Sequence, residues 1–216
     1  MPTLFVIAGP NGIGKTTSSY DLVPVNTPII NSDEIAKEIR KDLPSSINLQ
    51  EYVNHEAVRL MEEQRKEKKS FAIETNLADI ETWKFLIKVQ ETGYELHIVY
   101  LSTGNLAMLN NRIKERIRLG DHFVRPKIVE ERYTNSLKLL NHYFDKANKL
   151  QLFDNSQYLL LVGEIHFGEI IFQSENLPHW VKENLGQHFQ KKEQKEKSIR
   201  DMTINEIRER YGNQKK

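Results

Sequence analysis

The chain has 216 residues with 31 basic and 30 acidic side chains, so its formal net charge is only +1. This length suits one α/β domain with a core of normal size, and the balanced charge argues against a polybasic nucleic-acid or membrane binder. The absence of cysteine excludes disulfides, zinc–thiolate sites and thiol nucleophiles. No apolar run approaches the roughly 18 residues of a membrane span, and no secretory signal is recognisable, so we expect a cytoplasmic protein.

The first predicted strand, Thr3–Ala8, leads directly into a glycine-rich segment at residues 9–16. That segment fits G-x-x-x-x-G-K-[ST], the phosphate-binding loop, and a plausible helix follows it, as the motif requires. Inward-facing backbone amides and the positive end of the helix would bind phosphate oxygens. The residues expected to bind a nucleotide here are Gly9, Asn11, Gly12, Ile13, Gly14, Lys15, Thr16 and Thr17. Lys15 would reach the β- and γ-phosphates, and Thr16 would help to hold Mg²⁺.

A second, short strand is expected at Pro28–Asn31, and it brings the next acidic group to the edge of the sheet beside the loop. Asp33 could there accept or orient the proton of an acceptor hydroxyl. Ser32 or Asp33 could instead cap a helix expected at Glu34–Lys41. Both interpretations of Asp33 stay open at this point.

The third predicted strand, Ser70–Thr75, ends in polar groups. Glu74, Thr75 and Asn76 would lie at the ligand edge of the sheet, where they suggest contacts with a substrate or with metal-bound water. Local turn bonding at the strand exit is the alternative. We take all three as candidate substrate-binding residues.

The fourth predicted strand, Glu95–Leu101, precedes two helical patterns that would form a cationic flap at about residues 106–149. The flap contains Arg112, Lys114, Arg116, Arg118, His122, Arg125, Lys127 and Arg132. Arginines over the loop would neutralise charge on a transferring phosphoryl group, because the guanidinium is planar and always charged. An ordinary solvated basic face is the alternative.

The fifth strand is expected at Tyr158–Val162, and the alternation in Glu164–Gln173 predicts an extra strand or hairpin. Together these elements predict an α/β fold, the three-layer sandwich of P-loop NTPases, with a parallel sheet of about five strands and helices on both faces. We place this domain at residues 1–185. Residues 186–216 are charged with a weak helical stripe, which indicates a solvated helical tail or, alternatively, a partner-docking helix.

Three classes of phosphate-loop protein compete for this chain: small-molecule kinases, motor or transporter ATPases, and GTPase switches. Residues 101–105 resemble the Leu-Ser-Gly-Gly-Gln element of transporter ATPases only faintly, and no apolar strand ending in acids follows them. The Asn-Lys-x-Asp segment of a GTPase is missing. A kinase needs an acceptor base, acidic groups near the metal and cations on the phosphoryl group, and the chain offers candidates for each.

Four blocks, at residues 8–17, 31–36, 71–77 and 116–133, together resemble the zeta-toxin-like family of phosphate-loop kinases in its small stand-alone branch. The resemblance implies that Asp33 is the catalytic base and that Glu74 touches the acceptor. It also implies that Arg118 and Arg132 grip the ATP phosphates, with Arg116 as a close rival. Asn155 lies in what looks like a fifth block, near the nucleotide base. Asp33, Lys15, Arg118 and Arg132 are therefore the expected catalytic residues.

The resemblance further implies ATP and Mg²⁺ as cofactors, and the sugar of uridine diphosphate N-acetylglucosamine as the small-molecule hydroxyl acceptor. An antitoxin-like protein partner is an open option. The charged tail supports a rival class, a nucleotide-dependent binding protein whose surface a partner recognises. A polynucleotide-end kinase is less favoured, because net charge is balanced and basic residues are not interleaved with aromatic ones.

Overall fold

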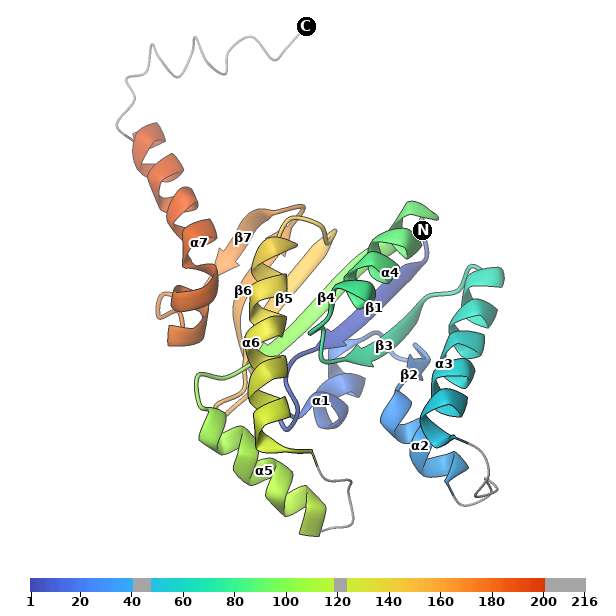
Figure 1. Ribbon diagram of the computed structural model, residues 1–216. Coiled ribbons are helices and arrows are strands. Elements are labelled where there is room, and N and C mark those ends of the chain that lie inside the picture. The colour runs from blue at the N-terminus through green and yellow to red at the C-terminus, as the bar shows by residue number, and fades with distance from the viewer. Residues whose placement is uncertain (41–47, 119–123, 201–216) are drawn as a thin grey trace, which may run out of the picture.

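The structure is a computed structural model that describes residues 1–40, 48–118 and 124–200. Seven strands form one sheet in the order β2-β3-β1-β4-β5-β6-β7 (Figure 1). The strands are β1 Thr3–Ala8, β2 Ile29–Ile30, β3 Phe71–Thr75, β4 Glu95–Ser102, β5 Lys149–Asp154, β6 Leu160–His166 and β7 Glu169–Gln173.

Five of these strands, β2, β3, β1, β4 and β5, run parallel. Strand β1 lies between β3 and β4, and its last residue, Ala8, pairs with Thr75 on one side and Tyr100 on the other. The phosphate-binding loop that leaves β1 therefore begins at the carboxyl edge of the parallel strands. Ligands of open α/β sheets bind at this edge, so the functional site is expected there.

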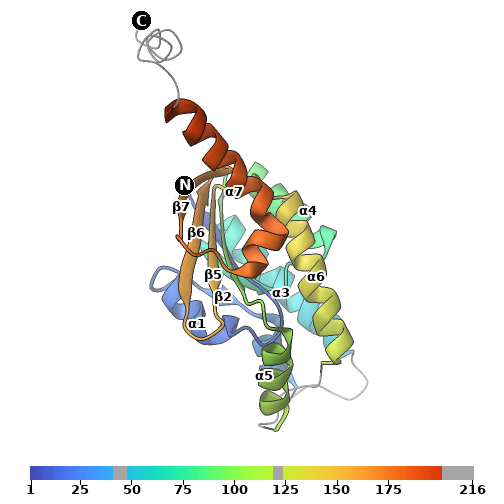
Figure 2. The ribbon, with the colours of Figure 1, turned by 90° about the vertical axis from the view of Figure 1, so that its left-hand side faces the viewer.

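Helices cover both faces of the sheet, as the sequence predicts. The described helices are α1 Lys15–Leu22, α2 Ser32–Ile39, α3 Leu49–Lys66, α4 Ile80–Glu91, α5 Leu106–Arg118, α6 Pro126–His142 and α7 His179–Arg200. Figure 2 shows α3, α4, α6 and α7 on one side of the sheet and α1 on the other. Trp83, Leu137 and Trp180 lie in the core of the first side. Ile13 and Leu109 lie in the smaller core of the other.

The fifth parallel strand is β5, Lys149–Asp154, so the strand expected at Tyr158–Val162 exists in part but is not the fifth parallel one. That segment overlaps β6, which pairs antiparallel with β5. No strand is predicted at residues 150–154, although the run Lys-Leu-Gln-Leu at the start of β5 alternates polar and apolar residues as a strand does. The flap prediction to residue 149 is correspondingly too long, since α6 ends at His142.

The alternating segment Glu164–Gln173, for which the sequence predicts an extra strand or a hairpin, forms part of a hairpin. Strands β6 and β7 pair antiparallel and are joined through Phe167 and Gly168, both of which have positive φ, 50° and 79°. Two such residues in succession are typical of a tight hairpin turn. The hairpin extends the parallel sheet to seven strands.

Helix α7 runs across the boundary that the sequence suggests at residue 186. Trp180, Val181, Leu185 and Phe189 are all at most 2% exposed and belong to the main core. The first turns of α7 are thus part of the domain, while the division into 1–185 and 186–216 stays a prediction. Within the described residues, no helix has both the length and the apolar character needed to cross a membrane.

Candidate functional site

The phosphate-binding loop has a backbone that only glycine fits at its first position. Gly9 has φ of 140°, and a Cβ there would lie 2.1 Å from the carbonyl oxygen of Leu101 on β4. Gly14, the residue before α1, has φ of 97° in the left-handed region, where other residues are strained. Ile13 between them is fully buried. Sequence, conformation and packing therefore agree on a loop wrapped closely around the start of α1.

Lys15 is a buried cation of the site whose pKa is shifted by its surroundings. Its ammonium donates to the carbonyl oxygens of Gly9 at 2.8 Å and Pro10 at 3.2 Å, and to the Asn76 Oδ1 at 3.2 Å. Burial lowers the pKa of Lys15 from 10.5 to about 8, although Glu74 and Asp33 oppose that shift. The lysine thus folds back over its own loop and retains a charge that phosphate oxygens would stabilise.

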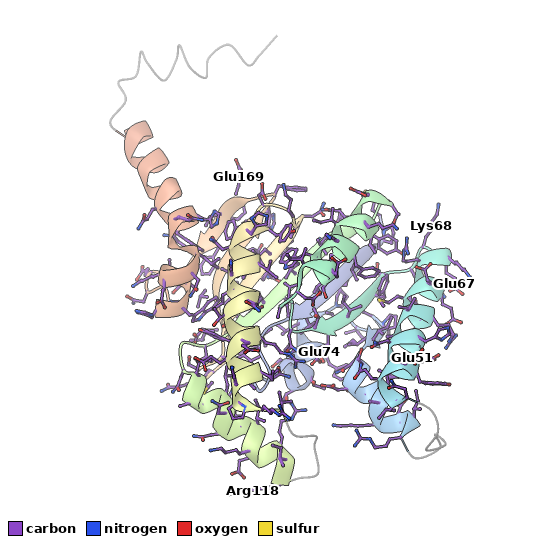
Figure 3. All side chains as sticks on the ribbon, in the orientation of Figure 1. Glu51, Glu67, Lys68, Glu74, Arg118 and Glu169 are labelled. Atoms are coloured by element: carbon purple, nitrogen blue, oxygen red, sulfur yellow. The ribbon has the colours of Figure 1, made fainter. Side chains whose placement is uncertain are left out.

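Glu74 lies against the hydroxyl of Thr16. Thr16 Oγ1 donates to the two carboxylate oxygens of Glu74 at 3.1 and 3.0 Å, and Asn31 Nδ2 donates to Oε2 at 3.0 Å. Burial raises the pKa of Glu74 above its ordinary value, with Lys15 acting in the opposite direction. Thr16 follows β1, Asn31 follows β2 and Glu74 lies in β3, so the neighbouring strands bring the three side chains together. Figure 3 shows Glu74 inside the molecule, near the loop end of the sheet.

Asn31, rather than Ser32 or Asp33, caps helix α2, so the capping interpretation of Asp33 is wrong. The Asn31 side chain accepts a hydrogen bond from the backbone N–H of Asp33 at 2.9 Å, and the helix begins at Ser32. Asp33 sits in the first turn with an exposed side chain that lines the cleft described below. Its carboxylate is therefore available to a ligand rather than committed to the backbone.

The exit of β3 holds the two other predicted substrate residues. Thr75 Oγ1 accepts from the backbone N–H of Leu77 at 3.1 Å, and Asn76 receives the Lys15 ammonium. Leu77 is fully buried and has φ of 54°, an uncommon conformation for a non-glycine residue. Strained turns of this kind gather at functional sites. Here the turn directs Asn76 toward the phosphate-binding loop.

A loop after β5 touches the phosphate-binding loop from the opposite side. Asn155 donates its side-chain amide to the carbonyl of Ile13 at 2.7 Å, and its own carbonyl accepts from Arg112 at 3.4 Å. Asp154 accepts from the indole N–H of Trp180 at 2.8 Å. The sequence predicted Asn155 at the site, but it singled out neither Arg112 among the flap cations nor Trp180. The sequence alone does not show which face of its helix points to the cleft, and only that orientation distinguishes Arg112 from the other flap cations.

The predicted flap arginines divide into two groups. Arg116 lines the cleft, and Arg132 donates to Asn11 Oδ1 of the phosphate-binding loop at 3.2 Å. Arg118 does not reach the site: its side chain is 75% exposed and pairs with Glu115 at 2.7 Å. Figure 3 shows Arg118 at the outer end of α5, well away from Glu74. His122 lies outside the described residues.

The phosphate-binding loop, the start of α2, the end of β3, helix α5 and Asn155 surround one cleft of about 1640 Å³. It is lined by Asn11, Gly12, Gly14, Lys15, Thr16, Thr17, Asn31, Asp33, Lys37, Arg40, Glu74, Thr75, Asn76, Asn111, Arg112, Glu115, Arg116 and Asn155, among others. The volume exceeds the roughly 300–1,000 Å³ of ordinary ligand pockets. It therefore has room for two ligands side by side.

The donor set fits Mg²⁺ but not a metal held by protein alone. Thr16 and Glu74 supply oxygen atoms, the ligands that Mg²⁺ prefers. The part of the chain that the structure describes contains no group of three or more His, Cys, Asp or Glu residues placed to hold an ion. Mg²⁺ commonly uses one or two protein groups together with water and substrate phosphates, which matches this arrangement.

A sheet with parallel strands in this order, a glycine-wrapped loop and an adjacent cationic flap together define a phosphate-loop kinase-like domain. Residues 4–140 match the protein family described as AAA domain, and the chain belongs to that family. An uncharacterized protein of Haemophilus influenzae is 28% identical over 128 residues, which cover 58% of this chain and 88% of the relative.

Solved structures show the same fold. A chain of the AvrRxo1-ORF1:AvrRxo1-ORF2 complex with ATP has a TM-score of 0.64 at 16% identity, covering 79% of this chain. This chain spans only 60% of that one. A chain of the PezAT toxin-antitoxin system of Streptococcus pneumoniae has a TM-score of 0.53 at 14% identity, covering 94% of this chain and 88% of that one. The resemblance inferred from sequence is thus confirmed as a likeness of fold.

Proposed function

We propose that the chain is an ATP-dependent kinase that transfers the γ-phosphoryl group to a hydroxyl of a small molecule. The observation that carries this proposal is the shared cleft, in which Asp33 faces the same space as Lys15 and Thr16 of the phosphate-binding loop. A hydrolase needs room only for water beside the phosphates, whereas a transferase needs a second ligand site. A nucleotide sugar such as uridine diphosphate N-acetylglucosamine is the acceptor that the family resemblance suggests.

The residues present would share the work as follows. The loop amides and Lys15 bind the β- and γ-phosphates, and Asp33 accepts the proton of the attacking hydroxyl. Arg116 and Arg132 neutralise charge on the phosphoryl oxygens. Thr16 and Glu74 would hold Mg²⁺, which supplies charge neutralisation on the phosphates when bound.

Incubation with γ-labelled ATP and separate acceptors tests the proposal. The acceptors are nucleotide sugars, free sugars and their phosphates, nucleosides, and an oligonucleotide with a 5′-hydroxyl. We expect label in a small molecule, and loss of at least about 100-fold of that label in Lys15→Ala, since one electrostatic contact to the transition state is worth this much. Label only in the oligonucleotide would instead assign a polynucleotide-end kinase. Label in inorganic phosphate alone would contradict the transferase.

The two structural relatives named above are complexes with partner proteins, which keeps a nucleotide-dependent binding protein as the second candidate. Removal of residues 201–216 distinguishes the kinase from the binding protein. A kinase should keep its turnover without these residues, whereas a protein that docks a partner through them should lose that partner. Truncation at residue 186 is unsuitable, since it would delete Phe189, which is only 2% exposed in the core.

A further inference from the structure

Asn31 is a buried polar residue between β2 and α2, and its side chain uses both ends of its amide. The residue is only 5% exposed. The amide oxygen accepts from the backbone N–H of Asp33 at 2.9 Å, and the amide nitrogen donates to Oε2 of Glu74 at 3.0 Å. Rotation of the amide by half a turn would set its nitrogen against the Asp33 N–H and its oxygen against the carboxylate. The two contacts together therefore fix the orientation of the Asn31 side chain.

The register of the sheet explains why Asn31 reaches Glu74. Ile29 pairs with Ala72 across β2 and β3, and both pack into the core on the α1 side of the sheet. Asn31 and Glu74 each lie two residues further along the chain, and Asn31 keeps extended angles, φ −121° and ψ 113°. Alternate residues of an extended chain share a face. Both side chains therefore lie on the face of the sheet where the phosphate-binding loop leads into α1.

Capping of α2 does not by itself require an asparagine with this second contact. A helix cap needs a side-chain acceptor, which serine and aspartate provide about as well as asparagine. Asn48 caps α3 in this way, since its oxygen accepts from the backbone N–H groups of Gln50 and Glu51. Asn31 differs from Asn48 because its amide nitrogen also contacts an acidic side chain from another part of the sheet.

The carboxylate oxygen that Asn31 contacts is one that also faces Thr16. Oε2 of Glu74 accepts from the Asn31 amide and from the Thr16 hydroxyl, each at 3.0 Å. Hydrogen bonds to an ionised group are stronger than those between neutral groups, so the amide restricts rotation of the carboxylate. Loss of the amide leaves the Thr16 hydroxyl as the hydrogen-bond donor to Glu74 among the described residues. The carboxylate could then turn away from the place where it would hold Mg²⁺.

We propose that Asn31 is a positioning residue that holds the Glu74 carboxylate against Thr16 and, with the other end of the same amide, sets the start of α2. The proposal rests on the metal-binding role given above to Thr16 and Glu74. One buried side chain then links the acid on the metal side of the cleft to the helix that carries Asp33. Asn31 takes no part in the transfer itself. It fixes where the carboxylates of Glu74 and Asp33 lie relative to each other.

The test measures how much Mg²⁺ strengthens the binding of ATP to the full chain. Titration of a fluorescent ATP analogue, with Mg²⁺ and then with a chelator, gives two dissociation constants whose ratio is the gain due to the metal. Asn31→Ser keeps an acceptor for the cap but removes the amide nitrogen that contacts Glu74. We expect this gain to fall about fivefold, which corresponds to one net hydrogen bond. The affinity for the metal-free nucleotide should stay within about twofold.

Two further variants separate positioning from a general loosening of the fold. Asn48→Ser is the matched control, because Asn48 also caps a helix but is exposed and does not line the cleft. It should leave the gain due to the metal unchanged. Glu74→Gln removes the charge through which Asn31 would act, so the addition of Asn31→Ser to Glu74→Gln should change the gain by no more than about twofold. A merely structural role would repeat the full fivefold loss.

The outcomes distinguish this inference from the kinase function. An unchanged gain in Asn31→Ser, or a full additional loss in the double variant, would overturn the inference. An unchanged gain in Glu74→Gln would also overturn it, because Glu74 would then not act on the metal. Nucleotide binding needs no acceptor, so a failure to label any acceptor removes the kinase proposal and leaves the role of Asn31 standing. If Mg²⁺ gives the unmodified protein no gain, the metal-binding role of Thr16 and Glu74 fails, and the inference fails with it.

Discussion

The hydroxyl of Thr16 lies 3.1 and 3.0 Å from the two carboxylate oxygens of Glu74. This contact joins the second residue of α1 to the end of β3. It places an acid next to Thr16, the residue expected to hold Mg²⁺. The family resemblance implies instead that Glu74 touches the acceptor. Its position beside Thr16 and Asn31 favours a role on the metal side of the cleft.

Glu74→Gln distinguishes these two roles. If Glu74 helps to hold the metal, we expect the Mg²⁺ concentration for half-maximal turnover of Glu74→Gln to rise about tenfold. This rise corresponds to one lost charge-assisted contact. The acceptor KM should stay unchanged. If the acceptor KM rises while the Mg²⁺ requirement stays the same, the resemblance-based role is correct. Glu115→Gln is the control, because Glu115 also lines the cleft but pairs with the outward-facing Arg118.

The same variant has a stability signature. Burial raises the folded-state pKa of Glu74 above its unfolded value, so the folded chain binds more protons than the unfolded chain between those two values. The buried charge therefore costs stability as pH rises through that window, and the cost is fully present above it. We expect the melting temperature of Glu74→Gln at pH 8 to equal or exceed that of the unmodified protein. A large drop would indicate that the carboxylate is mainly structural.

Asp33→Asn should abolish transfer without unfolding the protein. Because Asn31 provides the cap of α2, loss of the Asp33 charge removes only a helix-dipole contribution of about 0.3–1 kcal/mol. We expect kcat to fall at least about 100-fold, as for a general base, with the affinity for ATP unchanged. Asn31→Ala is the contrasting variant, since loss of a cap costs about 1 kcal/mol and lowers the melting temperature. A melting temperature lowered more by Asp33→Asn than by Asn31→Ala would contradict this assignment.

The parts of the site that a local pattern defines could be predicted from the sequence, and the parts that packing defines could not. The loop at residues 9–16 has a fixed spacing of glycines, and strands β1, β3 and β4 contain short apolar runs at residues 4–8, 71–73 and 98–101, so the loop and these strands could be predicted. Asn31, Ser32 and Asp33 are all good caps, and a sequence does not fix a helix start to within one residue. Only the hydrogen bond from the Asp33 N–H to Asn31 decides among them.

The flap arginines show the same limit. Arg112 and Arg118 lie on one amphipathic helix, and both are candidates by composition. The buried side chains of Leu109 and Ile113 set how α5 rotates against the loop, and that rotation brings Arg112 to Asn155 while Arg118 faces solvent. Trp180 and Phe189 were missed because their helix is charged on average, although both are buried.

Lys15 predicts a pH dependence of ATP binding. Its pKa in the free protein is lowered to about 8 by burial, and bound phosphates would raise it again. Above about pH 8, binding must therefore take up a proton, and the affinity should fall toward tenfold per pH unit. Titration with a fluorescent ATP analogue from pH 7.5 to 9.5 measures this slope. Lys15→Met should bind weakly with no slope, and a flat profile for the unmodified protein would count against the lysine–phosphate contact.

Arg112→Ala and Arg118→Ala should differ in their effect on ATP. Arg112 lies in the cleft and contacts the Asn155 loop, so we expect its loss to raise the dissociation constant for ATP about tenfold, or about 1.4 kcal/mol. Arg118 forms an exposed ion pair, and such pairs contribute little, so Arg118→Ala should stay within about twofold. The opposite ranking, measured by calorimetry, would restore the assignment implied by the family resemblance.

Trp180 connects the C-terminal helix to the loop of Asn155, which lines the cleft. Its indole N–H donates to Asp154, whose other oxygen accepts from the backbone N–H of Ser156 at 3.0 Å. Between them, Asn155 reaches the carbonyl of Ile13. Helix α7, which lies beyond the matched family region at residues 4–140, therefore holds the loop that touches the phosphate-binding site.

Trp180→Phe removes this hydrogen bond while keeping an aromatic ring in the core. One net hydrogen bond is worth about 1 kcal/mol, so we expect ATP affinity to fall about fivefold, together with a lower melting temperature. Trp83→Phe is the matched control, because Trp83 is equally buried and its indole N–H has no hydrogen-bond partner among the described residues. It should lower the melting temperature comparably and leave ATP affinity unchanged. Equal ATP affinities in the two variants would show that α7 supports the core but does not position Asn155.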